Sequence, residues 1–171
     1  VVGDGAVGLC GVLAAVQLGA ERIIAMSRHA DRQALARRFG ATDIVAERGD
    51  EGIDAVLELT GGIGAAAVLE CVGTQESVSQ ALRCARPGGM VGWVGVPHVT
   101  DIPQQHMFWR NVGLRGGVAP VRAYLPELLE RTLDGRIDPG AVFDLTLPLE
   151  SAAQAYAAMH ERQSIKALLR P

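Results

Sequence analysis

The sequence predicts an α/β protein built on a doubly wound parallel sheet. Three observations support this. Short apolar, β-branched runs alternate with helix-like segments up to about residue 118, glycines end many of the segments, and aromatic residues make up only 4% of the chain. Such alternation is typical of parallel strands joined by right-handed crossovers, with helices on both faces. The 171 residues, 49% of them hydrophobic, suffice for one core or slightly more.

The glycines and the hydrophobic periods divide the first half of the chain into elements. Two similar runs there are assigned differently. The run over 54–59 places apolar residues at helical spacing and ends at a glycine pair, whereas the run over 66–71 is continuous and apolar, as in a buried parallel strand. We therefore predict helices over 5–18, 29–39 and about 53–60, and strands over 21–27, 42–45 and 66–71.

The second half begins with the same alternation and then departs from it. Thr74 can cap a helix that ends before Pro87-Gly88-Gly89. Beyond Pro120 the apolar runs have no obvious place in the sheet. We predict helices over 75–86, about 124–133 and 149–161, strands over 90–96, 112–118 and 164–169, and a short apolar run over 142–147.

Charge and cysteine usage favour a small-molecule partner and a reducing compartment. With 16 basic and 19 acidic residues, the net charge of -3 gives no electrostatic attraction to nucleic acid or to an anionic membrane. Three widely spaced cysteines form neither a disulfide framework nor a metal-binding pair, which fits the cytoplasm. The longest apolar stretch is interrupted by Gln17 and Glu21, short of the roughly 20 residues needed to cross a bilayer.

The opening glycines match a dinucleotide-binding motif. Gly3-Asp4-Gly5-Ala6-Val7-Gly8 fits GxGxxG, in which the glycines allow a tight turn, close approach to a diphosphate, and close packing of the following helix on its strand. The alternative is an ordinary tight turn. The helix that follows, and a second strand ending near Ser27, favour dinucleotide binding. Only Val1 and Val2 precede the motif, so we expect the front of its strand to lie before residue 1.

The end of the second predicted strand indicates which dinucleotide is bound. A carboxylate at this place reads the ribose hydroxyls of NAD, but the chain has Ser27 and Arg28 there, with Arg32 one turn later. A hydroxyl and two guanidinium groups suit a 2′-phosphate. We therefore expect NADP(H), the alternative being that both arginines only solvate the start of a helix.

Several motifs in order resemble the medium-chain zinc-dependent alcohol dehydrogenases, and they span nearly the whole chain. They are GDGAVG, the GAT after the second helix, LTGGIGA, ECVGT, RPGGMVGWVGVP and the closing PLESAAQAYAAMHERQSIKALLRP. The resemblance implies a Rossmann domain over 1–118 and a segment over 119–171 that returns to a catalytic domain. Residue 1 would then lie inside the first strand of the cofactor domain, after a catalytic segment that this sequence lacks. One departure is Ala66, where relatives commonly have an aspartate.

The resemblance also implies a role for individual residues. Those facing the pyrophosphate would be Gly3, Gly5, Val7 and Gly8. Ser27 stands where NAD-preferring members carry an acid, and Arg28 and Arg32 would hold the ribose phosphate. Val72, Gly73 and Thr74 would lie beside the adenosine half; Val94, Gly95, Val96, Gly117, Val118 and Ala119 would line the nicotinamide; and Lys166 would contact the pyrophosphate.

The family's zinc ligands lie before the glycine motif, so the resemblance assigns no catalytic or metal-binding residue to this chain. His98, His106 and His160 have no usable ligand spacing. We expect the chain to bind NADP(H) without turnover by itself, and the full-length enzyme to oxidise a small alcohol or reduce a carbonyl. A zinc-free quinone or enoyl reductase and a non-catalytic nucleotide-sensing module are the alternatives. A homodimer through the strand over 112–118 is a further expectation.

Overall fold

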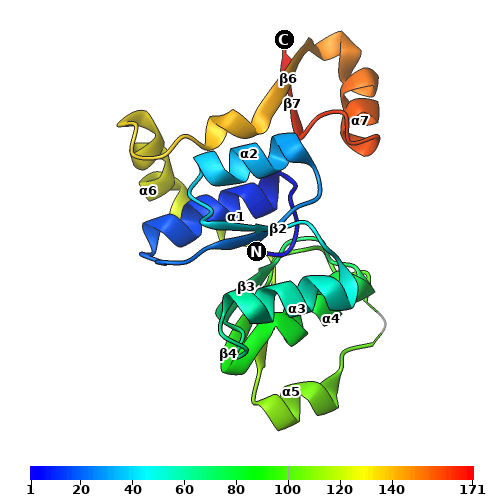
Figure 1. Ribbon diagram of the computed structural model, residues 1–171. Coiled ribbons are helices and arrows are strands. Elements are labelled where there is room, and N and C mark those ends of the chain that lie inside the picture. The colour runs from blue at the N-terminus through cyan, green and yellow to red at the C-terminus, as the bar shows by residue number, and fades with distance from the viewer. Residues whose placement is uncertain (100) are drawn as a thin grey trace. The chain divides into compact units, whose positions relative to one another are not determined.

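The computed structural model describes residues 1–99 and 101–171 and divides them into two compact units, Val1–Pro120 and Val121–Pro171 (Figure 1). Both units alternate strands and helices, and every strand pairing in them is parallel. The first unit holds the glycine motif and all but one of the predicted cofactor-binding residues. Lys166 belongs to the second unit.

The strands of the first unit run in an order that reverses at its middle. β2 (Asp43–Val45) pairs with β1 (Ile24–Met26), and β3 (Ala65–Glu70) pairs with β4 (Ala85–Trp93), which pairs with β5 (Gly113–Gly116). Val2 joins the two parts, because it forms parallel bridges with both Met26 and Glu70. The chain therefore leaves the centre of the sheet directly into the glycine motif. This confirms the predicted doubly wound α/β fold.

Helices cover both faces of this sheet. Helices α1 (Ala6–Gln17) and α2 (Ala30–Arg38) pack together, as do α3 (Gly49–Leu59) and α4 (Gln75–Cys84), and Figure 1 shows the two pairs on opposite sides of the strands. The core between the strands and the second pair contains Val78, Leu82 and Val91, all fully buried. Burial of each such side chain stabilises the fold by roughly 1.5–3 kcal/mol.

Several element boundaries differ from the predictions. β4 begins at Ala85, directly after α4, and not at Met90; the pairing shifts from Ala65 with Ala85 to Ala67 with Met90. The Pro87-Gly88-Gly89 segment is thus an irregularity within the strand, because Gly88 adopts a φ of +73° that a regular strand excludes. The strand also ends at Trp93, three residues earlier than predicted. α5 (Gln104–Arg110) was not predicted, because a segment of seven residues is too short to show the hydrophobic period of a helix.

The second unit is a helix followed by a compact β-α-β unit. It contains α6 (Val121–Leu133), the 3₁₀ turn η1 (Pro139–Val142), β6 (Phe143–Pro148), the 3₁₀ turn η2 (Leu149–Ser151), α7 (Ala152–His160) and β7 (Lys166–Arg170). β6 and β7 pair in parallel with α7 as their crossover, and they form a sheet separate from that of the first unit. The structure thus agrees with the expectation that the tail has no strand in the main sheet.

Asp144 connects the two strands of the second unit. Its carboxylate accepts hydrogen bonds from the Ser164 hydroxyl at 2.5 Å, the Ile165 N–H at 2.8 Å and the Lys166 N–H at 3.2 Å. Partial burial raises the pKa of Asp144, but the hydrogen bonds from Ser164, Ile165 and Lys166 outweigh it and hold the pKa below the usual 3.8. The ionised carboxylate is therefore the form that stabilises this connection.

We expect Asp144→Ala to lower the free energy of unfolding by about 1–2 kcal/mol, because three donors lose a charged acceptor. In the parent, the carboxylate's contribution is present above the unfolded pKa and is lost as the pH falls through the lower folded pKa. Urea titrations at pH 7 and pH 3 test both statements, with Asp54→Ala at an exposed position of α3 as the control. An Asp144 variant as stable as the parent at pH 7 contradicts the assignment.

Candidate dinucleotide-binding site

Five loops come together at the carboxyl edge of the main sheet. Because all its strands are parallel, the segments that follow their carboxyl ends lie along one edge. The loops are linked by close contacts: the Ser27 hydroxyl bonds to Asp4, Gly3 adjoins Val72, and Gly73 adjoins Val96. The segments are Gly3–Gly8, Ser27–Arg28, Val72–Thr74, Val94–Val96 and Gly117–Ala119. The structure thus brings together every predicted site residue of the first unit, including Arg32, which lies one turn into α2 and pairs with Asp4 of the glycine motif.

The three glycines of the motif have different surroundings, which explain in different ways why a glycine stands at each position. Gly3 has a φ of +113°, and a Cβ there would lie 2.7 Å from Val72 Cγ2. A Cβ on Gly8 would lie 2.0 Å from the Gly3 carbonyl oxygen, so α1 can start against the turn only with glycine. At Gly5, which is exposed, a Cβ would meet no described atom within 4 Å. The first and third glycines serve packing, whereas the second leaves open space in front of the helix.

The N-terminus of α1 suits an anion. Gly5 is its N-cap, no described side chain caps the helix, and its first turn contains no acidic residue. The first N–H groups of a helix have no partner within it, and the helix dipole favours negative charge at that end. Val7, in this first turn, is 54% exposed. The open space at Gly5 and these N–H groups therefore fit a diphosphate, as in other glycine-rich turns that precede a helix.

Glu70 holds the two neighbouring loops together, a role that the sequence analysis missed. It is fully buried at the end of β3, and its Oε1 accepts hydrogen bonds from the N–H groups of Val72 and Gly73, both at 2.8 Å. Its carbonyl oxygen accepts from the N–H groups of Val94 and Gly95. The signal available in the sequence was an acid at the end of an apolar strand, immediately before Cys-Val-Gly.

The loop after β3 leads directly into a capped helix. The Thr74 hydroxyl accepts a hydrogen bond from the Ser77 N–H at 3.2 Å, and the Ser77 hydroxyl accepts from the Thr74 N–H at 3.0 Å. This reciprocal cap confirms the predicted helix start. The Thr74 side chain is thus engaged in the cap, and Val72, 40% exposed, is the apolar surface of this loop.

Asp4, an unassigned position of the motif, contacts two of the residues expected to hold a ribose phosphate. Its carboxylate accepts a hydrogen bond from the Ser27 hydroxyl at 2.9 Å and pairs with Arg32 at 3.3 Å. Ser27 and Arg32 are 1% and 7% exposed, whereas Arg28 is exposed. Arg32 is therefore a buried partner of the glycine loop and not a free cation at a helix start.

Several basic groups surround this single carboxylate. Burial raises the pKa of Asp4, but the hydrogen bond from Ser27 and the charges of Arg32, His29 and Arg48 outweigh it and lower the pKa below 3.8. Asp4 is consequently ionised at neutral pH. Arg28, which is exposed, adds a further guanidinium group at the carboxyl end of β1.

The residues expected at the nicotinamide lie after β4 and β5. Val96 and Val118 are 70% and 100% exposed, and Gly117 has a φ of +148°. Gly95 lies very close to the neighbouring loop, since a Cβ there would be 2.4 Å from the Gly73 nitrogen. The two segments therefore present exposed valine side chains, and the backbone of the segment after β4 is held close to the loop after β3.

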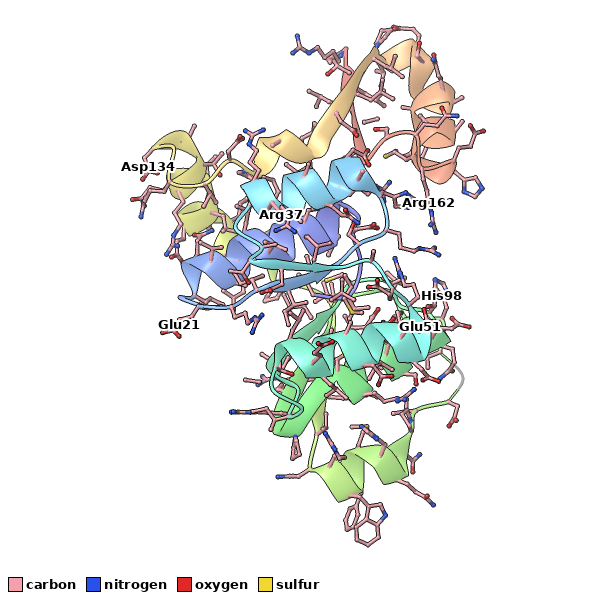
Figure 2. All side chains as sticks on the ribbon, viewed as in Figure 1. Glu21, Arg37, Glu51, His98, Asp134 and Arg162 are labelled. Carbon is pink, nitrogen blue, oxygen red and sulfur yellow. The ribbon has the colours of Figure 1, made fainter. Side chains whose placement is uncertain are left out.

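The described residues do not form a zinc site. In residues 1–99 and 101–171, no three His, Cys, Asp or Glu side chains are grouped so that they could hold a metal ion. His98, labelled in Figure 2, follows β4, and His106 Nε2 lies 3.3 Å from the Leu82 carbonyl oxygen. Burial raises the pKa of the Cys71 and Cys84 thiols to about 11, which keeps them protonated.

None of the helices within residues 1–99 and 101–171 has both the length and the apolar character that are needed to span a membrane.

The strand order, the helices on both faces and the glycine turn at the centre define a Rossmann-type α/β domain. Residues 6–134 match the family model described as zinc-binding dehydrogenase, and the chain belongs to that family. This confirms the resemblance inferred from the motifs.

Individual relatives agree with this assignment. A probable zinc-binding alcohol dehydrogenase of Mycobacterium tuberculosis is 38% identical over 100% of this chain and 44% of its own length. A zinc-type alcohol dehydrogenase B of Aspergillus flavus is 32% identical over 91% of this chain and 37% of its own. Among solved structures, an alcohol dehydrogenase from Thermus is 34% identical and superposes with a TM-score of 0.88, covering 98% of this chain and 50% of that one. The chain thus spans half or less of the length of these relatives.

Proposed function

We propose that this chain is the cofactor-binding portion of a zinc-type alcohol dehydrogenase and that its cofactor is NADP(H). Its family and the open N-terminus of α1 support a nicotinamide dinucleotide. A bound nicotinamide supplies or accepts a hydride at its C4 carbon, which interconverts an alcohol and a carbonyl compound. The zinc ligands of such an enzyme would lie outside residues 1–99 and 101–171 of this chain. The proposed role of this chain is therefore to bind and orient the dinucleotide.

The observation that favours NADP(H) over NAD(H) is the basic cluster around Asp4. Arg28 is exposed beside Ser27, while His29, Arg32 and Arg48 act electrostatically on Asp4. A 2′-phosphate adds about two negative charges that basic groups stabilise, and guanidinium groups bind phosphate oxygens through charge-assisted hydrogen bonds. Arg28 is the guanidinium that remains open to such a ligand.

The proposed course of the dinucleotide follows the loops along the sheet edge. Its diphosphate would lie at Gly3, Gly5, Val7 and Gly8, and its adenosine half beside Val72, Gly73 and Thr74. The exposed side chains of Val94, Val96 and Val118 would exclude water from one face of the nicotinamide, with Gly95, Gly117 and Ala119 leaving room for the ring. These valine side chains would orient the ring, and they contain no group that could accept or donate a hydride.

We expect the parent chain to bind NADPH at least tenfold more tightly than NADH. Trp93 ends β4 directly before the proposed nicotinamide segment, so its fluorescence reports binding. Arg28→Ala should weaken NADPH binding by about tenfold and leave NADH nearly unchanged, because only the phosphorylated ribose carries the extra charge. Arg38→Ala, at the far end of α2, is the matched control. Equal affinity for the two cofactors, or tighter NADH, refutes the NADP(H) assignment.

Two further proposals concern the assembly and location of the protein. β5 is at the end of the strand order, so its outer edge is available for pairing with the same strand of a second copy. The family and the cysteine usage support a dehydrogenase of the cytoplasm.

A further inference from the structure

We propose that Asp4 determines how strongly this chain discriminates between NADPH and NADH. The inference rests on the proposed dinucleotide function. Asp4 lies between Gly3 and Gly5, and its carboxylate extends to the end of β1 and the first turn of α2. It is an anion built into the part of the site where the 2′-substituent of the ribose is expected.

The contacts of Asp4 occupy the groups that a 2′-phosphate needs. The Ser27 hydroxyl donates to Asp4 Oδ2 at 2.9 Å, and Arg32 Nη1 lies 3.3 Å from Oδ1. Both donors are almost fully buried, and Gln33 Nε2 donates to the Ser27 carbonyl oxygen at 2.7 Å, which holds this end of β1 in place. The single O–H of Ser27 can therefore not turn toward a phosphate without leaving Asp4, and the almost fully buried guanidinium group of Arg32 is held on the same carboxylate.

The two cofactors experience this carboxylate in opposite ways. A 2′-hydroxyl is a hydrogen-bond donor that an ionised carboxylate accepts, whereas a 2′-phosphate is an anion that it repels. The repulsion is effective because Asp4 and its partners lie in a partly buried region where screening by salt is weak. Asp4 consequently lowers NADPH affinity, and the basic groups around it determine the preference that remains.

Asp4→Asn tests the inference, because the amide keeps the shape and an acceptor for Ser27 but removes the charge. We expect NADPH to bind at least fivefold more tightly and NADH equally or less tightly, so that the ratio of the two dissociation constants changes at least fivefold toward NADPH. Measuring 2′,5′-ADP against 5′-ADP repeats the comparison without the nicotinamide half. Asp4→Ser serves as a second uncharged variant if Asp4→Asn folds poorly, as judged by its thermal midpoint.

Asp31→Asn is the matched control. It removes the same charge from the residue next to Arg32, at an exposed position in the first turn of α2. A ratio that changes less than twofold in both Asp4 variants overturns the inference, and so does an equal change in Asp31→Asn. Failure of the parent to bind either cofactor instead refutes the proposed function, so the two failures are distinguishable.

Discussion

Replacing Gly73 by alanine is expected to lower the free energy of unfolding by about 3 kcal/mol or more. Two independent effects contribute. Gly73 has a φ of +91°, and an L-residue in the left-handed region costs roughly 1–2 kcal/mol. In addition, its Cβ would lie 1.9 Å from the Val96 carbonyl oxygen, a contact with backbone that no side-chain rotation relieves. Forced overpacking of this kind typically costs about 1–3 kcal/mol.

A matched substitution separates the two effects. Gly62 has a φ of +82°, but a Cβ there would meet no described atom within 4 Å. Gly62→Ala should therefore cost only about 1–2 kcal/mol, the conformational part alone. Urea unfolding followed by tryptophan fluorescence measures both variants. Equal losses of stability would show that the approach of Val96 to Gly73 contributes nothing.

The expected damage in Gly73→Ala extends to the proposed site. The Gly73 N–H donates to buried Glu70, and its carbonyl oxygen accepts from the His98 N–H at 2.9 Å. Pushing Val96 away disturbs both the loop after β3 and the loop after β4. Cofactor affinity should therefore fall together with stability, so this variant cannot by itself identify a binding residue.

Valine at Gly5 should have the opposite profile, with cofactor binding reduced about 100-fold and the fold retained. Gly5 has φ of -76° and ψ of 178°, which any residue adopts, and a Cβ there points into open space. If a diphosphate occupies that space, two added methyl groups on the Cβ exclude it from the N–H groups of α1. Stability should change by no more than about 1 kcal/mol, the usual range for an N-cap substitution.

NADPH titration and thermal unfolding of Gly5→Val together test this prediction. Gly5→Ala, with a smaller side chain, should show an intermediate loss of about tenfold. Gly140→Val is the control, because Gly140 also lies at the start of a helical turn but in the second unit. A folded Gly5→Val variant that binds NADPH as tightly as the parent would place the diphosphate elsewhere.

The glycine motif illustrates both sides of what a sequence can predict. Its spacing predicts a tight turn followed by a helix, and the structure has both. Its intervening Asp4 carried no signal, because the residues that give it a role are Ser27 and Arg32, 23 and 28 positions away. Glu70 was missed for a similar reason, since its backbone partners include the loop after the next strand.

Strand boundaries also separate what the sequence predicts from what depends on contacts between distant residues. The apolar run that begins at Met90 predicts a strand, but pairing with β3 extends it back to Ala85 through a segment rich in glycine and proline. The two runs of the tail predict short apolar segments, whereas only the folded chain shows that they pair with each other.

The sequence by itself determined the class of fold, the order of most elements and the place of the glycine turn that precedes α1. These follow from short-range regularities: hydrophobic period, helix caps and glycines at turns. The tertiary structure decided the register of β4, the existence of α5 and the pairing of β6 with β7. It also decided that Arg32 is buried and forms an ion pair with Asp4. The physical reason is that hydrogen bonds, ion pairs and burial between distant residues depend on distances that exist only once the sheet has formed.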